Sequence, residues 1–113
     1  MTDCRFGDIV LVPFPFTDQT ITKKRPAVIV SSDAYNRQRR DIILMAVTSQ
    51  MGSADFFGDM TINQWQDAGL LKPSVTKPVF TTVEKNLVLK KLGRMSKQDR
   101  SALQEALQTI LGE

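Results

Sequence analysis

Residues 26–30 read Pro-Ala-Val-Ile-Val, and this short run of small and β-branched apolar residues predicts a buried strand. A second run, Ile-Ile-Leu-Met-Ala-Val at residues 42–47, predicts another strand of the same kind. Residues 9–16 form a third apolar run, which Pro13 and Pro15 interrupt. Because proline cannot donate to a strand ladder, we expect this strand to bend or to reach a sheet edge there.

Shorter elements are expected between and after these strands. Residues 17–24 are polar and predict a loop, while residues 33–40 are compatible with one helical turn or with a long loop. A short strand is expected at 59–62, followed by a turn of helix over 63–69 that Asn63 caps and Gly69 ends. A further strand is expected after Pro73, running toward Val83.

The end of the chain predicts a helix. Ser96 can open it, with Asp99 three residues later as an approximate capping box. An apolar stripe at helical spacing then marks a face for the core or for a dimer interface, formed by Leu103, Ala106, Leu107, Ile110 and Leu111. Short strands, brief helical insertions and one terminal helix together indicate a mainly β (α+β) domain, a small barrel with the helix packed on it.

Length and composition bound the class of protein. The chain of 113 residues has room for one domain, spanning 1–113, and its 42% hydrophobic content is too ordinary for a disordered chain. No apolar run approaches the roughly 18 residues of a membrane span, and the N-terminus does not resemble a signal peptide. The single cysteine, Cys4, cannot form an internal disulfide. We therefore expect a small cytoplasmic protein with no membrane partner.

The chain contains no histidine, which removes histidine-based triads, the usual zinc sites and the two-histidine route of RNA cleavage. We expect no cofactor. Residues 72–100 carry a net charge of +6 and residues 20–41 one of +4, within a total of +3. These two segments could form one basic face that attracts phosphates, although chance clustering of surface charges is an equally good explanation.

Several motifs resemble those of the MazF/PemK family, toxins of type II toxin–antitoxin systems. They occur in family order from residue 7 to the terminal helix, at residues 7–10, 12–17, 24–31, 48–50, 69–75 and 92–96. The resemblance implies an SH3-like barrel of the CcdB/MazF type that forms a homodimer. It also implies a metal-independent, sequence-specific endoribonuclease that cuts single-stranded mRNA through 2′-hydroxyl attack and so inhibits translation and growth. The implied partners are RNA and a MazE/PemI-like antitoxin, with DNA contacted only through the antitoxin.

Two positions carry the chemistry that the resemblance implies. The family's catalytic arginine and threonine correspond to Arg25 and Thr48. A guanidinium presents a fork of donors to phosphate oxygens, and a hydroxyl can bond a non-bridging oxygen. A guanidinium keeps its proton at neutral pH, so charge stabilisation is the role expected of Arg25, and its part in acid/base chemistry stays open. Expected RNA contacts are Phe16, Thr17, Lys23, Lys24, Ser49, Gln50 and Lys77.

One stretch departs from the family pattern. Residues 76–80 are one residue shorter than in many members and lack a polar or acidic pair. Glu84 could substitute for that pair, or it could equally be a strand-end carboxylate paired with Lys85 or another neighbour. Two alternatives therefore stay open: a weakly active or inactive member that binds RNA or antitoxin, and a CcdB-like toxin that binds gyrase. The last residues, 109–113, lack the aromatic terminus associated with the latter. Trp65 could stack on a base, but packing is the favoured role.

Overall fold

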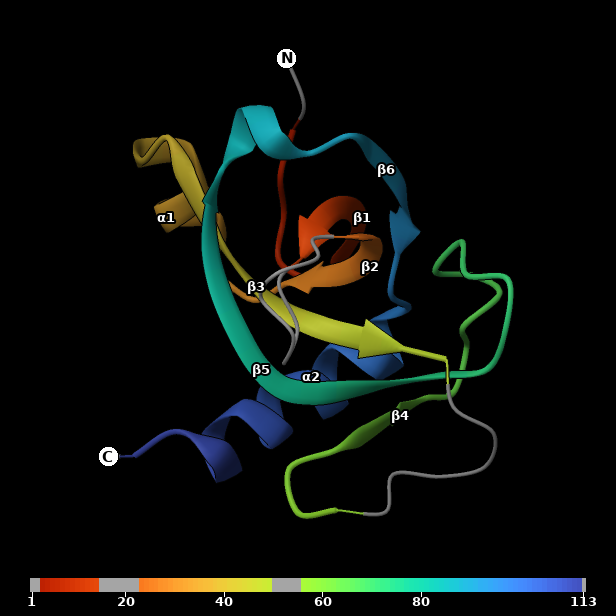
Figure 1. The fold of residues 1–113 in the computed structure, drawn as a ribbon. Coiled ribbons are helices and arrows are strands. Elements are labelled where there is room, and N and C mark those ends of the chain that lie inside the picture. The colour runs from red at the N-terminus through yellow and green to blue at the C-terminus, as the bar shows by residue number, and fades with distance from the viewer. Residues whose placement is uncertain (1–2, 15–22, 50–55, 113) are drawn as a thin grey trace.

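The computed structural model describes residues 3–14, 23–49 and 56–112, and its main element is a six-stranded antiparallel sheet (Figure 1). The order across the sheet is β4-β5-β3-β2-β1-β6. The strands are β1 (Asp8–Phe14), β2 (Lys23–Ile29), β3 (Asp41–Thr48), β4 (Met60–Ile62), β5 (Ser74–Glu84) and β6 (Lys90–Arg94). The sheet curls, so the mainly β, barrel-like fold expected from the sequence is confirmed.

The strands expected from the apolar runs are all present. Residues 26–29 of the first quoted run lie in β2 and residues 42–47 lie in β3, while the shorter elements after them form β4 and β5. β2 already begins at Lys23, so Lys23 and Lys24 belong to a strand and not to the loop expected over 17–24. Residues 15 and 16 of the run at 9–16 lie outside the described residues. β6 pairs with β1 only between Asp8 and Leu11, so Pro13 follows the point where that ladder ends. This agrees with the expectation that proline in this strand marks a sheet edge.

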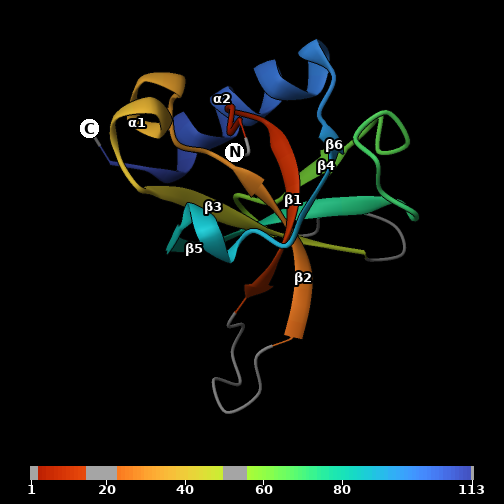
Figure 2. The same cartoon turned by 90° about the horizontal axis from the view of Figure 1, so that it is seen from above.

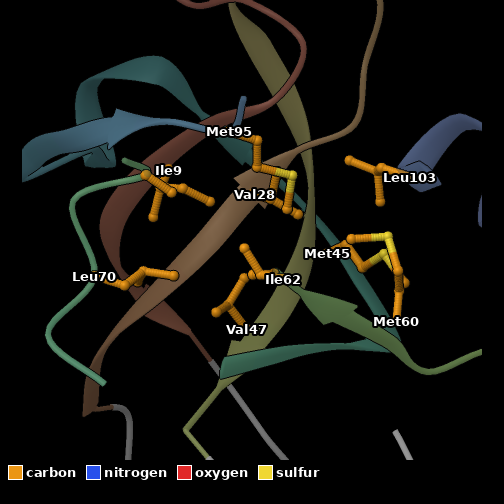
Figure 3. Close-up of a cluster of buried hydrophobic side chains, with 10 residues drawn as sticks. Ile9, Val28, Met45, Val47, Met60, Ile62, Leu70, Met95 and Leu103 are labelled. Atoms are coloured by element: carbon orange, nitrogen blue, oxygen red, sulfur yellow. The ribbon is translucent and has the colours of Figure 1, made fainter. Parts of the chain in front are cut away.

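Side chains on the two faces of the central strands enter two different cores, because neighbouring residues of a strand point to opposite faces. One core contains Ile9, Val28 and Met45, over which β4 and the terminal helix pack (Figure 3). The other contains Val10 and Ala27, together with Phe14, Ile29, Ile42, Leu44 and Ala46. Burial on both faces explains why these strands read as continuous apolar runs rather than as alternating ones.

Both helices lie on one side of the strands in Figure 2. α1 (Asp33–Gln38) settles the choice left open for residues 33–40 in favour of a short helix. α2 (Lys97–Ile110) begins after its N-cap Ser96, as expected, and buries Leu103 in the first core. Leu111 does not belong to the apolar stripe: it follows the end of α2 and is 56% exposed. Among the described residues, no helix is long and apolar enough to cross a membrane.

Strand β6 was not expected, because its sequence, Lys-Lys-Leu-Gly-Arg, contains no β-branched residue. Its pairing with β1 is supported by the buried carboxylate of Asp8. Lys91 Nζ lies 3.2 Å from one oxygen of this carboxylate, and Arg94 Nε lies 3.6 Å from the other. Electrostatic pairing to a buried anion thus adds to the ladder in a strand of weak intrinsic propensity.

The segment 63–70 forms successive turns rather than a regular helix, and the capping residue is not the expected Asn63. The backbone N–H groups of Asn63 and Gln64 donate to the carboxylate of Asp99, at 3.2 and 2.8 Å. Asp99 therefore completes only half of the expected capping box: its N–H donates to Ser96 Oγ, while its side chain holds this distant turn. Trp65 packs against the first core, which confirms its packing role.

Gly69 ends these turns with φ +80°, as expected, and brings the chain against β6. A Cβ on Gly69 would collide with the carbonyl oxygen of Leu92, and one on Gly93 would lie 2.5 Å from the carbonyl oxygen of Ala68. Figure 1 shows this green segment beside β6. The two glycines thus allow the segment that follows the edge strand β4 to contact β6, the strand at the other edge of the sheet. This contact narrows the gap between the two edges of the curled sheet.

Candidate functional site

Arg25 in β2 and Thr48 at the end of β3 line the same cleft, which has a volume of about 590 Å³. The β2–β3 register pairs Ala27 with Ala46, and its extension by two residues sets Arg25 opposite Thr48. The cleft lies at one end of the sheet, where β3 ends and β2, β5 and β6 begin. The structure thus brings together the two residues expected to be catalytic.

Pro26 explains why a cleft opens at this point. Proline has no N–H to donate, and the last pair of the β2–β3 ladder on this side is Ala27–Ala46, directly next to Pro26 in the chain. β2 stays paired with β1 as far as Lys23, so β2 itself continues. Both Pro26 and Val47 line the cleft at the place where the β2–β3 ladder has ended.

Residues 69–74 and β6 also line the cleft. They contribute Gly69, Leu70, Leu71, Lys72, Ser74, Lys90 and Leu92. The Oγ of Ser74 donates to the carbonyl oxygen of Lys72 at 2.8 Å, and the N–H of Leu70 donates to that of Trp65 at 3.1 Å. Sequence reasoning used residues 69–75 only as a family motif and assigned none of these side chains to the site.

The other expected RNA contacts fall in different places. Ser49 lines the cleft, and Lys23 and Lys24 are exposed at the start of β2. Lys77 does not line it: its ammonium lies 2.5 Å from the buried carboxylate of Asp59. Phe16, Thr17 and Gln50 lie outside the described residues. All these residues remain predictions as RNA contacts.

Glu84 is at the wrong end of the sheet to support Arg25. It pairs with Asp41 at the start of β3, whereas Thr48 at the other end of β3 pairs with Val75. Seven residue steps along β3 correspond to about 23 Å. Of the two roles left open for Glu84, substitution for an acidic partner of Arg25 is therefore excluded, and its place at the end of β5 fits a strand-end carboxylate.

The two basic segments do not form a single face. Arg25, Lys72 and Lys90 meet at the cleft described above. A second cleft, of about 450 Å³, is lined by the basic residues Arg37, Arg39, Arg40 and Lys85. A third, of about 540 Å³, is lined by Arg94, Lys97 and Arg100. The second contains Glu84 and the third Asp33, but the described residues that line the first include no aspartate or glutamate.

Cys4 lies in the second core, away from the cleft. Burial raises the pKa of its thiol, so the protonated, less nucleophilic form is favoured. Within ranges 3–14, 23–49 and 56–112, no group of three or more histidine, cysteine or acidic side chains could hold a metal ion. The reactive groups that line the cleft are thus guanidinium, ammonium and hydroxyl groups.

The geometry defines a domain built on a curled β sheet, with a cationic cleft at one end of that sheet. The chain matches over residues 5–111 the family of PemK-like, MazF-like toxins of type II toxin–antitoxin systems, and it belongs to this family. A search of curated proteins by sequence finds no match.

Solved structures of the same fold include proteins from Deinococcus radiodurans and from a mycobacterial species. MazF from Deinococcus radiodurans superposes with a TM-score of 0.75 at 17% identity, covering 100% of both chains. A MazE–MazF complex from the same organism gives 0.73 at 19%, covering 98% of both chains. An endoribonuclease in complex with its cognate antitoxin, from a mycobacterial species, gives 0.73 at 18%, covering 93% of this chain and 91% of that one. At these identities the likeness establishes the fold.

Proposed function

We propose that this protein is the toxin of a toxin–antitoxin pair and a metal-independent endoribonuclease that cuts single-stranded mRNA. The observation that carries the proposal is the meeting of Arg25 and Thr48 at a cleft whose described lining contains three cations and no carboxylate. A phosphodiester is the ligand that such a lining attracts, and the membership of the MazF-like toxin family supports the same substrate.

The reaction divides into three tasks. The 2′-hydroxyl attacks the adjacent phosphorus, the P–O5′ bond breaks, and the products are a 2′,3′-cyclic phosphate and a 5′-hydroxyl. Charge grows on the non-bridging oxygens during attack, and preorganised donors stabilise it. Arg25 serves this role with its guanidinium fork and Thr48 with its hydroxyl. A proton must also leave the 2′-hydroxyl and another must reach the leaving oxygen.

The partners follow from the same proposal. Two of the solved relatives are bound to antitoxins, and we infer a MazE-like antitoxin for this chain. We also infer a homodimer as the working unit. DNA is then a partner only through the antitoxin.

The deciding experiment incubates the purified protein with a long single-stranded RNA in EDTA and maps the cut ends. We expect discrete cuts that leave 5′-hydroxyl ends. Arg25→Ala should lower kcat/KM by at least about 100-fold, the usual cost of removing one donor to a developing charge. Arg37→Ala, which removes an arginine from the cleft at the other end of the sheet, is the matched control and should cut at the parent rate.

Intact RNA with the parent protein would overturn the proposed activity and favour a binding module instead. Equal cleavage by the Arg25→Ala variant would show that the reaction occurs elsewhere. Inhibition of gyrase without RNA cleavage would support the CcdB-like alternative. Circular dichroism of each variant checks that the fold is kept.

A further inference from the structure

We propose that Leu71, Lys72 and Lys90 form a substrate-binding wall opposite Arg25 and Thr48. In this proposal the two lysines contact phosphates flanking the scissile one, and Leu71 packs against a base. The inference rests on the proposed RNA substrate and assigns to it three residues of the cleft.

The two lysines are the first observation. Both are exposed and line the cleft, and neither has an ion-pair partner among the residues that the structure describes. Lys91, next to Lys90, shows the opposite arrangement, since its ammonium pairs with the buried Asp8. Because side chains alternate along a strand, β6 places one lysine on Asp8 and leaves its neighbour for a ligand.

Leu71 is the second observation. It is 93% exposed, although it directly follows the buried Leu70, and both residues line the cleft. Its backbone is held on both sides: the Leu70 N–H donates to the carbonyl of Trp65, and Ser74 Oγ donates to the carbonyl of Lys72. Gly69, pressed against β6, fixes where this segment begins. An apolar side chain presented to water by a well-anchored segment is preorganised for contact with a ligand.

The charge of the cleft identifies the occupant. Arg25, Lys72 and Lys90 are its ionisable side chains among the described residues, and all three are cationic. Single-stranded RNA carries the two kinds of group that these residues can bind: phosphates for the lysines and unstacked bases for Leu71. Lys90 is separated from Pro26 by the intervening strand β1, a distance of about 10 Å. The charges therefore lie on both sides of the cleft rather than at one point.

The test for the lysines is the salt dependence of binding to a 2′-O-methyl oligonucleotide, which cannot be cut because its nucleophile is blocked. Lys72→Ala and Lys90→Ala should each reduce the slope of log Kd against log salt by about 0.7, the value for one phosphate contact on a single strand. Lys97→Ala, an exposed lysine outside this cleft, is the matched control and should keep the parent slope. Parent slopes for both cleft variants would overturn the assignment.

The test for Leu71 uses the same oligonucleotide. Leu71→Ala should weaken binding by up to about tenfold, since apolar area on the protein is no longer buried, and should leave the salt slope unchanged. Leu111→Ala, another exposed leucine, is the control. Unchanged affinity would overturn the role of Leu71 in binding. Analytical ultracentrifugation of the variant measures its oligomeric state. Unchanged affinity per site together with dissociation of a dimer would show that Leu71 contacts a second copy of the chain and not a base.

The outcomes also separate this inference from the proposed activity. If the parent cuts RNA and all three variants bind as the parent does, the wall is wrong and the ribonuclease stands. If the parent binds the oligonucleotide through these residues but leaves unmodified RNA intact, the wall stands and the ribonuclease is wrong.

Discussion

Similar numbers of basic residues lie near the two ends of strand β3, but the two ends differ in the acidic residues that accompany them. At the Asp41 end, Arg39 donates to the Asp41 carboxylate at 2.9 and 3.4 Å, and the neighbouring cleft contains Glu84. At the Thr48 end, the residues of the cleft lining that the structure describes include no carboxylate. The Asp41 end includes the most conspicuous basic run of the sequence, Arg-Gln-Arg-Arg at residues 37–40, whereas the cationic side chains of the Thr48 end come from three separate segments.

If the proposed RNA site lies at the Thr48 end, local charge density in the sequence does not locate it. What matters is whether acids accompany the bases once the chain has folded. Carboxylates beside a group of cations lower its positive potential, and the described lining of the cleft at the Thr48 end contains none. The following three changes break or sharpen the contrast between the two ends.

The largest effect is expected from Asp99→Ala, which removes the anchor of the wall at the Thr48 end. The Asp99 residue is 1% exposed and accepts the N–H groups of Asn63 and Gln64. The variant leaves these donors unpaired and removes a negative charge from the first turn of α2, so unfolding should become easier by about 3 kcal/mol. Chemical denaturation measures this change.

Asp67→Ala is the control for that experiment, since Asp67 is exposed in the same turn segment. It should change the free energy of unfolding by less than about 0.5 kcal/mol. Equal stability of the Asp99→Ala and parent proteins would mean that the turn segment holds its position without this carboxylate.

An intermediate effect is expected when a carboxylate is placed at each end in turn. Ser49→Asp adds one to the cleft at the Thr48 end and should weaken binding of single-stranded RNA by at least about fivefold at 0.1 M salt, the value of one phosphate contact. Asn86→Asp adds the same charge to the cleft that already holds Glu84 and should leave affinity unchanged. Fluorescence anisotropy measures both. Equal losses would show that the two ends contribute alike.

The sequence predicted most of the fold because its central strands are buried on both faces and read as apolar runs. It did not predict β6, whose pairing is supported by the buried Asp8 rather than by strand propensity. It also missed Lys90 as a site residue, because nothing local distinguishes Lys90 from Lys91. The meeting of Arg25 and Thr48 was expected only from the family motifs, since their proximity depends on a strand register that residue patterns do not specify.

The smallest effect is expected at the exposed ion pair between Arg39 and Asp41. Hydrogen bonding to Arg39 lowers the pKa of Asp41, so the carboxylate form is favoured in the folded state. Its contribution to stability is present above the ordinary aspartate value, about 3.9, and is lost as pH falls through the lower folded-state value. Arg39→Ala should therefore raise the pKa of Asp41 in an NMR carboxyl titration, while Arg37→Ala should not. An unchanged pKa in Arg39→Ala would mean that Asp41 is not held by this arginine, and the contrast between the two ends would then rest on Glu84 alone.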